Sequence, residues 1–183
     1  MAIRIKNKLN LGCGRDIKDG YVNVDCADLP GVDVIMDLEK FPYPFKDNTF
    51  DEIICNHVLE HLSDLCKTME ESHRICKNGA LIKIRVPYFS NPEHHNDPTH
   101  KRKFTYNTFE YFTEKSSHPY YSKARFDILK RRILFFGWGA KFMKSKYTWP
   151  FDVLMTKFNK IYQRFFCYIL PAAELHVLLK VKK

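Results

Sequence analysis

Seven short apolar segments, spaced along the chain, constrain the fold more than any other feature of the sequence. Each is short enough for a strand and is bounded by glycine, proline or polar residues, at positions 8–11, 21–24, 32–36, 52–55, 80–86, 126–136 and 174–181. Between the fourth and fifth segments, apolar residues recur at helical spacing over 58–77, and Asn78-Gly79 supplies a stop signal. A strand, a helix and a strand in this order predict a parallel crossover. We therefore expect an α/β fold around a seven-stranded sheet.

The connections between the first strands are short for such a fold. About ten residues separate the first segment from the second, and fewer separate the second from the third. Residues 16–20 have room for a turn or a single helical turn. The first crossovers are therefore predicted to be abbreviated, with a weak or absent phosphate-binding helix N-terminus.

Length and composition favour one cytoplasmic domain. The 183 residues suit a single domain over 1–183, with an aromatic and basic insert at about 137–171. No apolar run approaches the roughly 20 residues that span a bilayer. Residues 1–6 lack the apolar run that is typical of a signal peptide. The six cysteines contain no Cys-x-x-Cys pair, which favours reduced structural thiols over a disulfide or zinc site.

Charge is divided unevenly between the two halves of the chain. The net charge of +9 arises from about −2 over residues 1–91 and about +11 over residues 92–183. The basic half can attract an anionic substrate or partner. Solvated lysines that keep the protein soluble are the alternative explanation.

A glycine loop and two carboxylates follow the first three strands in turn. Gly12 and Gly14 come directly after the first strand, where residues without a Cβ allow a sharp turn and the close approach of a ligand. Asp25 and Asp37 end the next two segments. Because the carboxyl ends of parallel strands share one edge of a sheet, these groups are predicted to lie together, where open α/β sheets bind ligands.

These residues carry a family resemblance. The segment Leu9-Asn10-Leu11-Gly12-Cys13-Gly14, the segment 45–51 and the following His57-Val58-Leu59-Glu60-His61-Leu62 resemble motifs of the class I S-adenosylmethionine-dependent methyltransferases, as does 170–177. The resemblance implies a Rossmann-like class I methyltransferase fold, with a seven-stranded, mostly parallel sheet whose last strand is antiparallel. It also implies S-adenosylmethionine as the cofactor.

By this resemblance, residues 12–14 line the methionine moiety, Asp25 holds the ribose, and Asp37 with its neighbour borders the adenine. The expected cofactor-binding residues are Asn10, Gly12, Cys13, Gly14, Asp25, Asp37, Leu38 and Asn56. Two positions depart from the family pattern, because Asn10 replaces an acidic residue and Asp16 replaces a third glycine. Asn10 can still bind through water, although it lacks charge attraction for the cofactor's ammonium group. A class I fold that has lost its cofactor, or uses the crevice otherwise, is the alternative.

Histidines after the fourth and fifth strands are the candidates for acceptor chemistry. His57 and His100 are the expected catalytic residues, since a neutral imidazole can remove a proton from an acceptor hydroxyl or amine. His61 is interpreted as a structural residue inside the helix. The cluster at 94–100 has no known metal-site spacing, so we predict no metal and leave open a hydrogen-bonded loop or an acceptor-binding role. His100 could instead cap a following helix without touching substrate.

The acceptor is predicted to be a small molecule or a glycan, with acidic character. Lys101, Arg102 and Lys103 follow the histidine cluster and would attract phosphate or carboxylate. Nucleic acid is disfavoured because no recognised binding module accompanies the basic residues. A noncatalytic binding module on the same fold, anchored to an anionic surface, is the rival hypothesis. A dinucleotide-dependent oxidoreductase is disfavoured by the missing third glycine.

The insert has apolar and aromatic residues at helical spacing over 151–169, with lysines and an arginine between them. This pattern fits a helix docked on the core, a lid over the acceptor, or a helix on a membrane surface. We expect Phe158 and Phe165 to lie against protein, because an exposed stripe of that size invites aggregation or membrane contact.

Overall fold

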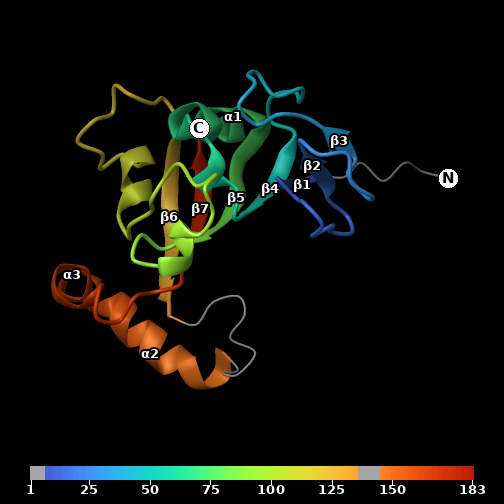
Figure 1. Ribbon diagram of the computed structural model, residues 1–183. Helices are drawn as coiled ribbons and strands as arrows, with labels where there is room; N and C mark the ends of the chain where they lie inside the picture. The colour runs from blue at the N-terminus through green and yellow to red at the C-terminus, as the bar shows by residue number, and fades with distance from the viewer. Residues whose placement is uncertain (1–6, 136–144) are drawn as a thin grey trace.

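Seven strands pair into one mixed sheet, in the order β3-β2-β1-β4-β5-β7-β6 (Figure 1). The computed structural model describes residues 7–135 and 145–183. The strands are β1 Lys8–Leu11, β2 Val22–Asp25, β3 Val34–Ile35, β4 Phe50–Asn56, β5 Cys76–Pro87, β6 Arg125–Leu134 and β7 Glu174–Lys182.

The register of the sheet confirms the predicted Rossmann-like class I methyltransferase fold. Leu9 of β1 pairs in parallel with Val22 of β2 and Ile53 of β4, so β1 lies in the middle of the parallel part. β7 runs antiparallel to both of its neighbours, β5 and β6. Leu9 and Leu11 on one face of β1 and Asn10 on the other are all buried, as expected for a strand covered on both faces.

A network of side chains replaces helices in the first crossovers. The structure shows turns and no helix across residues 12–21 and 26–33, which confirms that these crossovers are abbreviated. Asn23 Oδ1 accepts hydrogen bonds from Asn10 Nδ2 (3.0 Å) and from Lys18 N (2.9 Å), while Asp33 Oδ2 accepts one from Asn23 N (2.8 Å). These bonds give hydrogen-bond partners to polar groups of β1, β2 and the two turns.

The predicted helix over 58–77 is wrong at both ends. The 3-10 helix η1 spans only Leu59–His61, and the α-helix α1 spans Leu65–Ile75. Leu62 is extended, and Asp64 then caps α1 by accepting a hydrogen bond from Lys67 N (2.9 Å). Leu59 and Leu62 are nevertheless buried, so apolar spacing continued across a break in the helix. As a result, residues 57–61 follow β4 directly and include the short helix η1, instead of lying inside the predicted long helix.

The connection from β5 to β6 is fixed against η1 by backbone hydrogen bonds. It contains η2 Pro92–His95 and η3 Thr108–Phe112, and it is anchored by the buried rings of Tyr88 and Phe104. Lys101 N and Arg102 N both donate to the backbone carbonyl of Glu60, at 2.7 and 3.1 Å. These bonds bring the histidine-rich segment 94–100 beside the end of β4.

The insert forms an arm attached to the edge strand β6 (Figure 1). Its described part contains α2 Ser145–Lys157, α3 Asn159–Ile161 and the π-helical turn η4 Tyr162–Phe166, while positions 137–144 of the predicted insert lie outside the described residues. Ile133 N donates to Thr156 Oγ1 (3.0 Å) and Phe135 N donates to Asp152 Oδ1 (3.2 Å). These bonds hold one side of α2 against the sheet.

The expectation that Phe158 and Phe165 pack against protein is wrong. Their exposed fractions are 47% and 66%. The inner side of the arm is already filled by Phe151 and by the buried Tyr162, whose rings contact Phe135 at centroid distances of 4.8 and 5.0 Å. Over the described part of the arm, apolar residues therefore occur on two sides, and the described residues of the core cover one of them. Within the two described ranges, no helix combines the length and apolar character needed to cross a bilayer.

Candidate active site

A cleft of about 450 Å³ opens where β4 and β5 end and β7 begins. Its walls come from the residues after β4, from η1, from the end of β5, from the segment 91–100 and from the start of β7. The lining residues are Asp16, Asn56, His57, Glu60, His61, Arg85, Pro87, Asn91, Glu93, His94, Asp97, His100, Ala173 and Glu174. The two predicted catalytic histidines thus line one cleft, together with Asn56 and Asp97. None of the described residues of the insert lines it.

His57 is held between two carboxylates. Its backbone has a positive φ of 52° and its N–H donates to the carbonyl of Arg85 at 2.8 Å. The ring places Nε2 at 3.2 Å from Glu174 Oε1 and Nδ1 at 3.3 Å from Glu60 Oε1. Hydrogen bonding to Glu174, and then to Glu60, raises the pKa of His57 to about 9. At neutral pH the ring is protonated, which favours a cationic positioning role over proton acceptance.

Glu174 and Arg85 are central to the cleft, and sequence reasoning missed both. Arg85 Nη2 lies 3.0 Å from Glu174 Oε2, and His176 Nε2 lies 2.6 Å from the same oxygen. Burial alone would raise the pKa of the Glu174 carboxyl. Hydrogen bonds from His176 and His57, with the charge of Arg85, outweigh burial and hold that pKa well below its ordinary value. The available signal was that Glu174 is the one acid of β7 and Arg85 the one arginine of β5.

Glu60 is the other missed acid, and it is fully buried. Neither carboxylate oxygen receives a well-formed hydrogen bond, although Oε1 lies beside His57. The charge of His57 compensates that of Glu60, since an uncompensated buried carboxylate would be costly. Glu60 is therefore a buried carboxylate that forms an ion pair with His57 and lines the cleft.

His100 is arranged to accept a proton. Its Nδ1 lies 2.9 Å from the backbone carbonyl oxygen of His94. Because a carbonyl can only accept, Nδ1 must carry the hydrogen, which leaves the lone pair on Nε2 in the neutral ring. Nε2 lies 3.7 Å from Asp97 Oδ2. This arrangement fixes the tautomer that a base requires.

His61 lines the same cleft and is not inside a long helix as interpreted from the sequence. Thr99 Oγ1 donates to Asp97 Oδ1 at 2.6 Å, so it accepts the hydrogen of His61 Nδ1 at 2.8 Å. The His61 ring packs edge-on against His100 at 4.7 Å.

Ligand atoms of Glu60, His61 and His100 lie within 4.8 Å of one another. A carboxylate with two imidazoles could hold a divalent cation, in competition with His57 for Glu60.

The basic segment after His100 is directed away from the cleft. Lys101 Nζ lies 3.0 Å from Glu39 Oε1, and Arg102 Nε donates to the carbonyl of Leu62 at 2.8 Å. Neither side chain lines the cleft. The predicted attraction of an acidic acceptor by these two residues therefore lacks support from their positions.

The glycine loop has one glycine required by packing and one beside open space. Gly12 has a φ of 63°, and a Cβ there would lie 2.5 Å from Val58 Cγ2. Gly14 has a φ of 50°, and a Cβ there would meet nothing within 4 Å. Cys13 between them is buried, and its N–H donates to the carbonyl of Val24 at 2.9 Å. The loop is thus fixed to β2 and leaves room on its Gly14 side.

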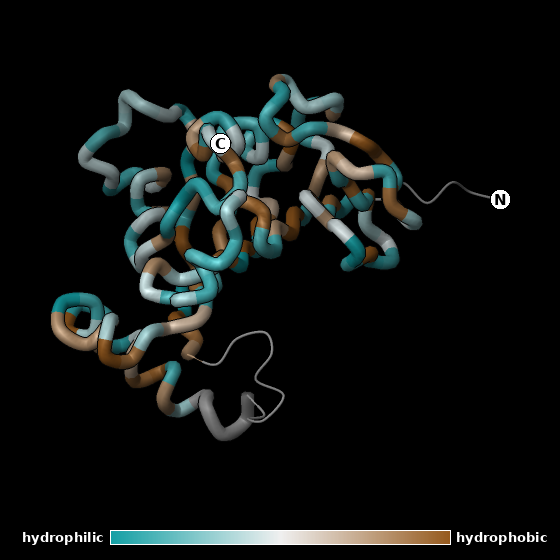
Figure 2. Tube along the Cα trace, in the orientation of Figure 1, coloured by the Kyte–Doolittle hydropathy of each residue, from teal (hydrophilic) through white to brown (hydrophobic). Residues whose placement is uncertain are grey.

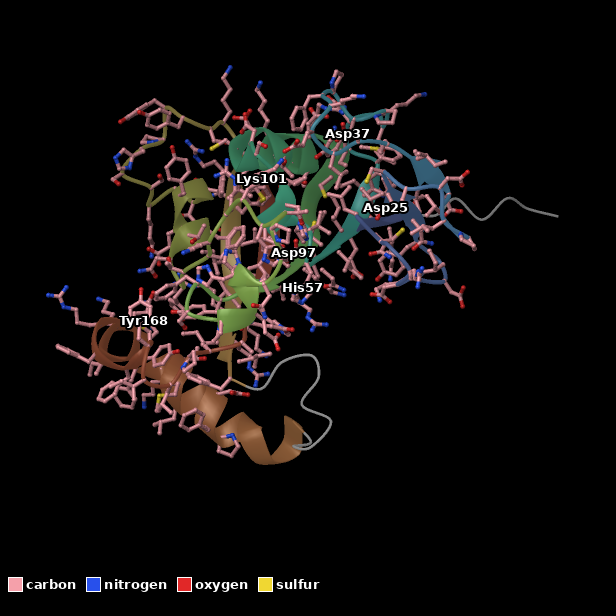
Figure 3. The ribbon with its side chains drawn as sticks, in the orientation of Figure 1. Asp25, Asp37, His57, Asp97, Lys101 and Tyr168 are labelled. Atoms are coloured by element: carbon pink, nitrogen blue, oxygen red, sulfur yellow. The ribbon has the colours of Figure 1, made fainter. Side chains whose placement is uncertain are left out.

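The two strand-end carboxylates lie at neighbouring positions on the edge of the sheet, on the side of the molecule away from the arm (Figure 3). Asp25 Oδ2 accepts from Gly14 N at 2.7 Å and Oδ1 accepts from Ala27 N at 3.0 Å. A carboxylate has about four acceptor positions, so Asp25 keeps lone pairs for a ligand. Asp37 Oδ1 accepts from Glu39 N at 2.9 Å, and its side chain is 46% exposed.

Two further predicted cofactor residues, Asn10 and Leu38, are buried. Asn10 is buried, and its Nδ2 donates to the carbonyl of Asp16 at 2.8 Å and to Asn23 Oδ1 at 3.0 Å. Both amide hydrogens are therefore committed to the protein. Leu38 is buried, and its carbonyl accepts from Tyr43 Oη at 3.0 Å.

Part of the chain is similar to a known protein family and to two curated proteins. A family model described as a methyltransferase domain matches residues 13–84. The chain is 54% identical over 44 residues to an uncharacterized protein of Methanocaldococcus jannaschii, covering 24% of this chain and 19% of that protein. It is 32% identical over 94 residues to a human mitochondrial protein named arginine-hydroxylase, covering 40% of this chain and 27% of that protein. The matched segments thus span less than a third of either relative.

The fold is shared with solved methyltransferase structures over nearly the whole chain. A S-adenosylmethionine-dependent methyltransferase from Archaeoglobus fulgidus superposes with a TM-score of 0.61 at 17% identity, covering 94% of this chain and 85% of that one. A putative methyltransferase from Bacillus halodurans superposes with a TM-score of 0.59 at 14% identity, covering 96% and 92%. Residues 13–84 thus match a methyltransferase domain model, and the chain has the fold of class I S-adenosylmethionine-dependent methyltransferases.

Proposed function

We propose that this protein transfers a methyl group from S-adenosylmethionine to a hydroxyl or amine of a small-molecule or glycan acceptor. The observation that carries the proposal is the placement of two sites on one sheet edge. The glycine loop with Asp25 and Asp37 occupies the β1 to β3 side, and the histidine cleft occupies the β4 to β7 side (Figure 3). Asn56, at the end of β4, lies between them.

Two observations support the fit of the cofactor. Open space beside Gly14 allows a ligand to approach the loop backbone, and Asp25 retains lone pairs that can accept hydrogen bonds from ribose hydroxyls. Residues 12–14 would line the methionine moiety, while Asp37 and Leu38 would border the adenine. Asn10 would act indirectly, by holding the loop. When bound, the cofactor supplies a methyl group on a positively charged sulfur, so alignment of the acceptor accounts for much of the rate.

In the cleft, the chain's own residues would orient the acceptor and take its proton. His100 Nε2 is the proposed proton acceptor, because its Nδ1 is held by a carbonyl. His57, protonated between Glu60 and Glu174, would fix the shape of the cleft and offset its negative charge. Carboxylates and imidazoles together suit an acceptor rich in hydroxyl groups. Lys101 and Arg102 are engaged elsewhere, so they are assigned no contact with an acidic group of the acceptor.

Calorimetry with S-adenosylmethionine and with its demethylated product tests the cofactor site. Asp25→Ala is expected to weaken binding by about 10- to 100-fold, because hydrogen bonds to a charged group contribute about 1.5 to 3 kcal/mol. Asp28→Ala is the matched control, since Asp28 is exposed on the same loop. Unchanged affinity for Asp25→Ala, or no heat with either ligand for the natural chain, would contradict the proposed cofactor site.

Transfer of a labelled methyl group to cell extracts, followed by mass spectrometry of the products, tests the reaction. A gain of one CH₂ unit in a product supports methyl transfer. Cofactor binding without any product would favour the noncatalytic module, while a gain of one oxygen atom would favour a reaction like that named for the human relative.

A further inference from the structure

The arm formed by α2, α3 and η4 has an outer surface that the fold does not use. Its inner side is secured to β6 and to the chain after η4: Asp152 is 4% exposed, Tyr162 is 1% exposed, and Tyr162 Oη donates to the carbonyl of Leu170 at 2.8 Å. The arm is therefore held at several points along its length. Exposure of its other side does not come from loose attachment.

The outer surface carries many exposed apolar side chains along the arm. Figure 2 shows hydrophobic residues, with hydrophilic ones between them, along α2 and the turns that follow it. Tyr168 is 80% exposed and Ile169 72%, and exposed fractions of 47% to 66% are found for Leu154, Phe158, Ile161, Phe165 and Leu170. Large apolar side chains so exposed and so close in sequence are a sign of an interaction surface.

The charges beside this surface have one sign. Lys157, Lys160 and Arg164 are exposed on the arm, between the apolar residues. The acid of the segment 150–171, Asp152, is buried and accepts a hydrogen bond from Phe135 N. A second copy of the chain would bring these cations against each other on a protein of net charge +9, whereas an anionic lipid surface would pair with them.

We propose that the arm, which we name the docking arm (residues 150–171), binds peripherally to anionic membrane surfaces. Phe165, Ile169 and Leu170 enter the boundary between headgroups and acyl chains, while Tyr168 lies at the headgroup level, where amphipathic rings are favoured. Lys157, Lys160 and Arg164 contact the anionic headgroups. Both contributions are needed, because a short amphipathic segment binds weakly through apolar burial alone. The proposal does not depend on the reaction proposed above.

Co-sedimentation of the full chain with lipid vesicles tests the docking arm. Vesicles of phosphatidylcholine with phosphatidylglycerol are expected to bind the protein, and vesicles of phosphatidylcholine alone to bind it at least about tenfold more weakly. Phe165→Asp combined with Ile169→Asp is expected to weaken binding to the anionic vesicles at least about tenfold, since it removes apolar burial and adds negative charge. Lys160→Glu combined with Arg164→Glu is expected to weaken binding and to reduce its sensitivity to salt.

Leu129→Asp is the matched control, because Leu129 is 52% exposed on β6 and lies outside the docking arm. It should bind vesicles as the natural chain does. Far-ultraviolet circular dichroism and thermal unfolding establish that each variant is folded. The proposal is overturned if the natural chain does not sediment with anionic vesicles, or if Leu129→Asp loses binding as much as the arm variants. It is also overturned if sedimentation velocity shows a dimer that the arm variants dissociate, since a second copy then covers the surface.

Discussion

Replacing His57 by glutamine should change how the stability of the protein depends on pH. The pKa of His57 is raised from its ordinary value of 6.5 to about 9 in the folded protein, chiefly by Glu174. A group with a raised pKa stabilises the fold fully below its unfolded pKa, and this contribution disappears as the pH rises through its folded pKa. The difference between the two pKa values corresponds to at most about 3 kcal/mol. Because the side chain is 39% exposed, solvent screening reduces this to about 1 to 2 kcal/mol.

Urea unfolding at about pH 6 and about pH 9.5 measures this contribution. The natural chain should lose about 1 to 2 kcal/mol more unfolding free energy between these pH values than His57→Gln does. His95→Gln serves as the control, because His95 is exposed and does not line the cleft, and it should keep the natural pH dependence. Equal pH dependence in His57→Gln and the natural chain would show that His57 is not held protonated by the two carboxylates.

Further predictions concern the loop, the buried acid and the proposed base. Gly12→Ala should cost about 2 to 4 kcal/mol of unfolding free energy, from its left-handed backbone and its clash with Val58. Gly14→Ala should cost about 1 to 2 kcal/mol and chiefly weaken cofactor binding, and equal costs for both variants would refute the packing argument. Glu174→Gln should lower the pKa of His57 toward its ordinary value, as read from the NMR titration of its ring, whereas an unchanged titration would assign the shift to Glu60. His100→Gln should reduce turnover at least about 100-fold with unchanged cofactor affinity, whereas full turnover would leave alignment alone to explain the rate.

The fold could be predicted because most of its strands are short apolar runs that end at glycine, proline or polar residues in the sequence itself. The strand β1 begins and ends where the sequence predicted, since the apolar run of Leu9 and Leu11 is followed at once by Gly12. The strand β3 is shorter than the predicted 32–36, because pairing with β2 covers only Val24 and Asp25. The helix prediction failed because apolar spacing cannot reveal that Leu62 is extended before the cap at Asp64.

The cleft could be predicted only in part, because several of its residues meet through strand pairing. Arg85 and Glu174 are 89 positions apart and come together because β7 enters the sheet beside β5. No local pattern marks such a pair. The arm shows a different limit, since helical spacing predicts an apolar side but does not say how much of it the core will cover.

The position of β7 also has a consequence for biosynthesis. On the ribosome, residues 7–87 emerge with β1 to β5 well before residues 174–182 are made. Until then the β5 edge is unpaired, and Arg85 and His57 lack the carboxylate of Glu174. An open strand edge is a site for wrong pairing with other chains. The nascent chain is therefore expected to depend on chaperones over this interval, and interrupted translation should yield products that are cleared by proteolysis instead of retaining a partly formed cleft.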